Sequence, residues 1–74
     1  MINYIKKGTI KKIIRAKSSF QGNPNFKIVV DGIGVIQTKN DSMINYSISP
    51  NMENKTYEFH IAEYRNSLRL VNFK

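Results

Sequence analysis

Basic side chains gather near the N-terminus in a spacing that suits the binding of an anion. Residues 1–17 hold Lys6, Lys7, Lys11, Lys12, Arg15 and Lys17 but no acid, so these six account for all but one of the chain's net charge of +7. On a β-strand, every second residue would place a cation on the same face, about 6.6 Å apart. This spacing is similar to that of successive phosphates on an extended single strand. The pattern therefore predicts a polyanion site.

The predicted row of cations consists of Lys11, Arg15 and Lys17, which share one face if residues 9–17 are extended. Lys27 would extend the row from a neighbouring strand, while Lys6, Lys7 and Lys12 would add to the positive field. Neutralising phosphates releases counterions, so binding through such a row weakens as salt rises. The alternative is a solvated edge strand whose lysines only prevent aggregation.

Aromatic side chains on the same surface would let bases stack, as single-strand binding requires. Phe20 is the one aromatic residue of the polar segment 18–25, so it belongs to no alternating apolar pattern that would place it in the core. Tyr64 and Phe73 fall on the outward parity of their strands and lie close in sequence to Arg65 and Arg69, which join the predicted site. Phe26, Tyr57 and Phe59 are assigned to the core.

Residues for catalysis or metal binding are sparse. His60 is the single histidine, no cysteine occurs, and the five acids are scattered along the chain. No phosphate-binding glycine loop, nucleophile elbow or zinc-ligand spacing is found. We therefore expect no enzyme, no cofactor and no metal.

The elements that must position these residues are predicted to be strands in one small domain, residues 1–74. Thr9, Ile10, Ile13 and Ile14 favour a strand over a helix for residues 2–16, with Gly8 as a bulge or bend and with Ile10 and Ile14 anchoring the core. Segments 26–30 and 33–39 are joined by the Asp31-Gly32 turn signal. Two further strands are expected at 55–64 and 68–73, and Met43–Ile48 is a candidate extra strand.

This layout predicts an all-β fold, a small antiparallel barrel of five to six strands. The long first strand with a mid-strand glycine, the hairpin, the long connection and the second hairpin resemble the OB-fold. An SH3-like barrel and an open sheet are the alternatives. The resemblance implies a small nucleic-acid-binding protein.

Three functions follow from this sequence. The first is a non-catalytic domain that binds single-stranded DNA or RNA through the basic first strand and outward aromatics. The second is an inhibitor or interaction module, encoded by a phage or mobile element, that docks on an acidic host protein, for example by adding a strand to a sheet edge. The third, a basic N-terminal helix on a membrane, conflicts with Gly8 and the isoleucines. We expect no membrane partner, leave a homo-oligomer open, and expect a cytoplasmic location because signal peptide and membrane span are lacking.

Overall fold

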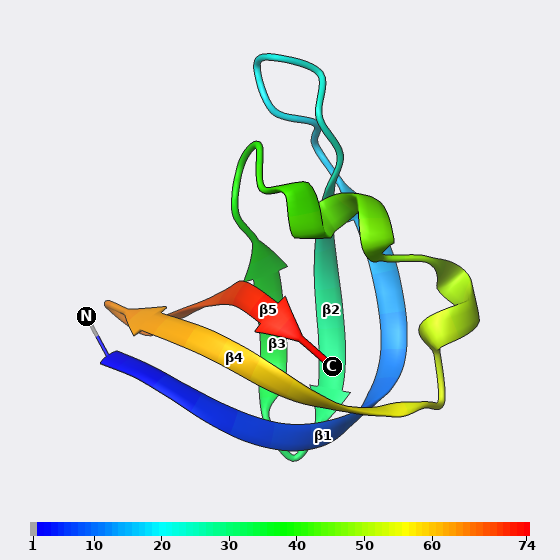
Figure 1. Ribbon diagram of the computed structural model, residues 1–74, viewed down its shortest axis with the longest axis vertical. Helices are drawn as coiled ribbons and strands as arrows, with labels where there is room; N and C mark the ends of the chain where they lie inside the picture. The colour runs from blue at the N-terminus through cyan, green and yellow to red at the C-terminus, as the bar shows by residue number, and fades with distance from the viewer. Residues whose placement is uncertain (1) are drawn as a thin grey trace.

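Five strands account for most of the chain in the computed structural model, which describes residues 2–74 (Figure 1). They are β1 (Ile2–Ala16), β2 (Asn25–Asp31), β3 (Gly34–Thr38), β4 (Thr56–Tyr64) and β5 (Ser67–Phe73). Two short 3-10 helices, η1 (Met43–Ser47) and η2 (Pro50–Met52), connect β3 to β4. The predicted all-β fold is confirmed, and residues 2–16 form a strand rather than a helix. Among the described residues, no helix has the length and apolar character that crossing a bilayer requires.

The strands close into a barrel in the order β1-β2-β3-β5-β4, and β1 completes the circle by pairing with β4. Residues 2–9 of β1 pair with β4, and residues 9–16 pair with β2. In Figure 1 this long strand curves under the barrel and up its side. The β3–β5 contact is parallel, while all other pairs are antiparallel. This closed order is OB-like and excludes the open sheet.

The core fills the inside of the barrel with apolar side chains from every strand. Phe59, Ile10, Ile28, Ile36, Ile61 and Leu70 are fully buried. Ile48 and Met52, from the connection between β3 and β4, close the core. The alternating patterns of segments 26–30 and 57–61 correctly predicted buried residues of β2 and β4, namely Ile28, Val30, Phe59 and Ile61.

Two β-bulges shift the inward face of their strands and overturn two predictions. Ile10 pairs with Val30 and Lys12 with Val29, so Lys11 is the extra residue of a bulge. Beyond it, Ile13 packs against the core, whereas Ile14 is 42% exposed, contrary to the expected core role. His60 of β4 pairs with Asn72 of β5, and Ile61 pairs with Leu70, so Val71 of β5 is the extra residue of a second bulge.

Phe73 lies beyond this second bulge and therefore turns inward rather than outward. It packs against the core, with its ring centroid 5.5 Å from that of Tyr57 in an edge-to-face arrangement. The prediction that Phe73 is an outward stacking residue is wrong.

Gly8 was expected at a bulge or bend; the bulge lies at Lys11 instead, and Gly8 is required for close packing where β1 passes from β4 to β2. It is buried at the place where β1 leaves β4 and begins to pair with β2. A Cβ atom at Gly8 would lie 2.5 Å from Cγ1 of Val30 and 3.0 Å from Cδ1 of Ile33. The strand crosses the barrel closely here because the residue has no side chain.

The connection between β3 and β4 forms 3-10 helices, so the expected strand at Met43–Ile48 is wrong. Asn45 explains the difference, since its side chain is fully buried under the connection. Its Nδ2 donates to the carbonyl oxygens of Pro24 and Lys39, at 3.0 and 2.7 Å. These bonds tie η1 to the start of β2 and the end of β3, which a strand at this place would not do.

Both hairpins turn where the sequence predicted. Gly32 has φ +85°, and the Ile33 amide donates to the Val30 carbonyl across the β2–β3 turn. The β4–β5 turn uses Arg65 and Asn66, both with positive φ, as tight two-residue hairpins require.

Candidate functional site

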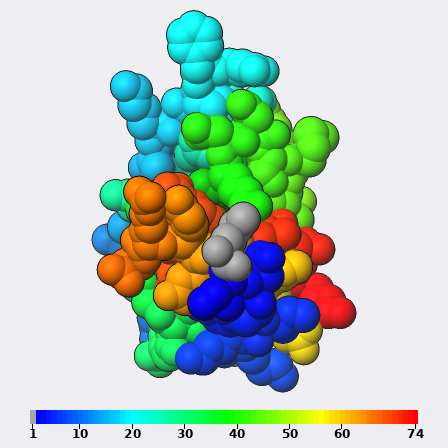
Figure 2. All heavy atoms as spheres, turned by 90° about the vertical axis from the view of Figure 1, so that its left-hand side faces the viewer, coloured from blue at the N-terminus to red at the C-terminus, as the bar shows by residue number. Residues whose placement is uncertain are grey.

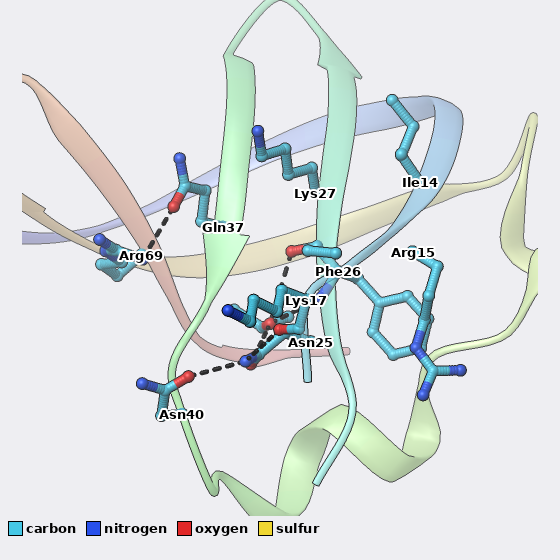
Figure 3. Close-up of a pocket in the computed structure, with 11 residues that line it drawn as sticks. Ile14, Arg15, Lys17, Asn25, Phe26, Lys27, Gln37, Asn40 and Arg69 are labelled. Atoms are coloured by element: carbon cyan, nitrogen blue, oxygen red, sulfur yellow. Dashed lines mark hydrogen bonds between the residues drawn. The ribbon is translucent and has the colours of Figure 1, made fainter. Parts of the chain in front are cut away.

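An open groove of about 390 Å³ lies on the outer face of the barrel and crosses β1, β2, β3 and β5 (Figure 3). We call it the basic groove. Its lining residues are Ile14, Arg15, Ala16, Lys17, Asn25, Phe26, Lys27, Gln37, Thr38, Asn40 and Arg69. Four of them are cationic and none is a carboxylate, so the groove has a strongly positive potential.

The floor of the basic groove is one row of side chains aligned by strand pairing. Ile14 of β1 lies opposite Lys27 of β2, and Lys27 lies opposite Gln37 of β3. Gln37 in turn pairs with Arg69 of β5. Since paired residues point to the same face of a sheet, these four side chains all reach the outer surface. Ile14 belongs to this row because the bulge at Lys11 turned it outward.

Two of the cations are held in place by neighbouring side chains. Nη1 of Arg69 donates to Oε1 of Gln37 at 2.9 Å. The guanidinium carbon of Arg15 lies 5.6 Å from the ring centroid of Phe26, in a cation–π contact. Figure 3 shows Arg15 beside the Phe26 ring on one wall of the groove. Phe26 was assigned to the core, and it does pack there, but it also lines this wall.

The basic groove unites four of the cations that the sequence predicted for the site: Arg15, Lys17, Lys27 and Arg69. The predicted row of Lys11, Arg15 and Lys17 does not form, because Lys11 is the bulge residue and does not line the groove. Lys11 is exposed outside it.

Lys6 and Lys7 lie on the half of β1 that pairs with β4, opposite Phe59 and Glu58. Both side chains are exposed, but neither lines the basic groove. They contribute to the net charge of the molecule and make suitable control positions for the groove.

Of the aromatic residues predicted to face outward, Phe20 and Tyr64 are exposed, but neither lines the groove. Phe20 is fully exposed in the loop between β1 and β2, which projects from the top of the barrel in Figures 1 and 2. Tyr64 is 52% exposed at the β4–β5 turn, where the Arg65 guanidinium covers its ring at 5.2 Å. Figure 2 shows this orange turn well below the projecting loop. The two aromatics therefore occupy separate parts of the surface.

A carboxylate holds the projecting loop against the rest of the molecule. Asp41 accepts hydrogen bonds from Oγ of Ser19 at 2.6 Å and Nδ2 of Asn23 at 2.7 Å. These two bonds lower the pKa of the Asp41 carboxyl below its ordinary value, with the Ser19 bond contributing most. The Tyr46 hydroxyl also donates to Oδ1 of Asn23. The loop that follows Lys17 is thus docked on the segment that precedes and includes η1.

The sequence missed the neutral polar residues of the basic groove, chiefly Asn25, Gln37 and Asn40. Uncharged amides are common on surfaces, so only the strand register could have placed them beside the cations. No group of three or more His, Cys, Asp or Glu side chains that could hold a metal is found among residues 2–74.

No protein-family model, curated protein or solved structure matches this chain. Its function therefore has to be inferred from the groove and the barrel themselves.

Proposed function

We propose that this protein is a non-catalytic domain that binds single-stranded DNA or RNA along the basic groove. The observation that carries the proposal is the convergence of Arg15, Lys17, Lys27 and Arg69 on one open groove without a carboxylate. Four cations brought together from three strands and a loop repel one another, and an acidic ligand would relieve that repulsion.

The position of the groove supports the same conclusion. In OB-fold barrels generally, the surface over β2 and β3 and the adjoining loops bind oligonucleotides or oligosaccharides. The basic groove lies over β2 and β3 and is bordered by Lys17 at the start of the β1–β2 loop. Because one fold hosts many functions, the charge of the groove decides the class of ligand. Four cations favour a nucleic acid over a neutral sugar.

The dimensions of the groove favour a single strand. Its volume of about 390 Å³ is in the range that encloses a small molecule. One extended strand can place its backbone in a space of this size, whereas a duplex is too wide to enter it. A single strand can also bring its bases to Phe20 in the projecting loop.

Fluorescence anisotropy with labelled 15-nucleotide single strands and the matching duplex tests this proposal at 50 mM salt. Wild-type protein should bind both single-stranded DNA and RNA more tightly than the duplex. Lys17→Ala/Lys27→Ala should weaken binding by roughly tenfold or more, because two phosphate contacts are lost. Lys6→Ala/Lys7→Ala makes the same change in net charge outside the groove and should have a much smaller effect. Equal losses in the two double variants, or no binding by wild type, would contradict the proposal.

A docking module for a protein partner is the second candidate, and one observation favours it. Phe20, Met43 and Tyr46 are 107%, 80% and 62% exposed on the β1–β2 loop and η1. Aromatic and methionine side chains are enriched in protein interfaces. Under this reading, Met43→Glu would abolish capture of a stoichiometric protein partner from a nuclease-treated lysate, while Lys27→Ala would leave that capture intact.

A further inference from the structure

Two side-chain amides of the basic groove are held with their oxygen bonded to another residue and their NH2 group free, and Gln37 is the first example. Its Oε1 accepts from the Arg69 guanidinium at 2.9 Å. A guanidinium has donors only, so the Gln37 amide must turn its oxygen toward Arg69. Nε2 of Gln37 is then left facing away from Arg69 as a donor, as Figure 3 shows.

A second amide is oriented in the same sense by a chain of hydrogen bonds. Nδ2 of Asn25 donates to the Lys17 carbonyl at 3.1 Å and to Oδ1 of Asn40 at 2.7 Å. A carbonyl can only accept, which fixes the NH2 group of Asn25 toward Lys17 and Asn40. The oxygen of Asn25 accepts from the Thr38 hydroxyl at 3.0 Å. Asn40 therefore uses its oxygen internally, and its NH2 group is turned away from Asn25 in Figure 3.

The polar side-chain atoms that remain free in the groove are therefore donors. They belong to the four cations, to Gln37 and to Asn40, while the side-chain oxygens of Asn25, Gln37, Thr38 and Asn40 already accept hydrogen bonds. The one aromatic ring that lines the groove, Phe26, is covered by Arg15. Every side-chain oxygen that lines the groove is therefore engaged by a donor of the protein, so the groove offers a base neither an open ring face nor an unengaged side-chain acceptor.

A phosphodiester matches this set of donors, because its anionic oxygens only accept. Base edges do not match it, since cytosine and adenine present amino groups that need an acceptor. We infer that the basic groove holds the sugar-phosphate backbone, with the bases directed away from the barrel toward solvent or toward Phe20. This inference rests on the proposed function, and it makes the contacts in the groove independent of base sequence.

Competition at low salt tests this orientation in Phe20→Ala protein, which removes any stacking on the projecting loop, with three unlabelled probes against labelled dT15. The probes are unlabelled dT15, an abasic deoxyribose-phosphate 15-mer and inorganic polyphosphate of similar length. The abasic strand should compete within about threefold of dT15, and polyphosphate should also compete. An abasic strand that is about tenfold weaker or worse would overturn the inference while leaving the proposed function standing.

Two further outcomes separate the orientation from the function itself. Binding of labelled polyphosphate without binding of either oligonucleotide would overturn the proposed function and the inference together, whereas a weak abasic strand overturns the inference alone. Competition by poly-L-glutamate as strong as that of dT15 would overturn the inference, because carboxylates on a protein would then serve equally well.

Isosteric amide-to-acid substitutions test the donor set directly. Gln37→Glu and Asn40→Asp each replace a donor with an anionic acceptor and should weaken both dT15 and the abasic strand by roughly tenfold. Asn51→Asp makes the same chemical change at an exposed residue of η2 outside the groove and should have little effect. Unchanged affinity for both strands in Gln37→Glu, with folding verified by circular dichroism, would overturn the inference.

Discussion

Single polar residues hold the loops around the basic groove in place. Buried Asn45 bonds the carbonyls of Pro24 and Lys39, and Asp41 bonds Ser19 and Asn23. These contacts join segments that are far apart in the sequence. They fix the loop that follows Lys17, which is the cation at the border of the groove. The shape of the groove thus depends on a few neutral and acidic side chains that carry no binding role of their own.

The docking of the β1–β2 loop is predicted to depend on pH through Asp41. Its pKa is lower in the folded protein than the ordinary value of 3.8, so the carboxylate stabilises the folded state above that value. This contribution is lost as pH falls through the lowered pKa. Urea unfolding between pH 2 and 7 should show that Asp41→Asn lacks this dependence, since Asn also tolerates the positive φ of 63°.

Asp31→Asn is the matched control for Asp41→Asn, because it removes a carboxylate from the exposed β2–β3 hairpin. Identical pH profiles for wild type and Asp41→Asn would contradict the role assigned to Asp41.

Of the residues that line the basic groove, the sequence predicted only the charged ones as site residues. Lys17, Lys27 and Arg69 were identified because cations on strands of a small basic chain point to an anionic ligand. Gln37 and Asn40 were missed because a neutral amide has no distinctive signal until the register places it beside Arg69 or Asn25. Phe26 was assigned to the core alone. Its half-buried ring contacts the core and also lines the groove.

Among the strands, the alternation of apolar and polar residues predicted which side chains point inward as far as each β-bulge. Beyond a bulge, the predicted faces were wrong. The period of two identified β2 and most of β4 correctly, and β-branched residues identified β1. A bulge adds one residue and inverts the faces that follow, as it did for Ile14 and Phe73. A bulge at Lys11 has no marker in the sequence, because any residue can occupy it. The same insertion brings Ile14 into the row that forms the floor of the groove.

The bulge at Lys11 predicts that adjacent isoleucines contribute unequally to stability. Ile13 packs against the core and Ile14 does not. Ile13→Ala should therefore lower the free energy of unfolding by about 1–2 kcal/mol, and Ile14→Ala by about 0.5 kcal/mol or less. Urea denaturation of the two variants measures the difference directly. A larger loss for Ile14→Ala would show that β1 continues without the bulge.

Gly8 provides the second prediction for β1. Gly8→Ala would force a methyl group against Val30 and Ile33, so the free energy of unfolding should fall by about 1–3 kcal/mol. Exposed Lys12 in the same strand is the control, and Lys12→Ala should change stability by about 0.5 kcal/mol or less. Equal stability of wild type and Gly8→Ala in thermal or urea unfolding would contradict the close crossing of β1 over β2.

Closure of the barrel decides which basic residues of the sequence lie on the same surface. The sequence placed most of the net charge on residues 1–17. Folding divides these residues between two sides of the barrel, because half of β1 pairs with β4 and half with β2. Only Arg15 and Lys17 then join Lys27 and Arg69 in the basic groove. Lys6, Lys7 and Lys11 therefore lie outside the basic groove, to which β2, β3 and β5 contribute Lys27, Gln37 and Arg69.

The salt dependence of single-strand binding tests the central claim most directly. Four groove cations that each neutralise a phosphate predict a slope of about −3 for log affinity against log salt, at about −0.7 per contact on a single strand. Anisotropy with labelled dT15 between 50 and 300 mM salt measures this slope. In Lys27→Ala the slope should become less steep by about 0.7, while Lys6→Ala should leave it unchanged. A wild-type slope near zero, or equal slopes for wild type and Lys27→Ala, would show that the basic groove does not bind the strand.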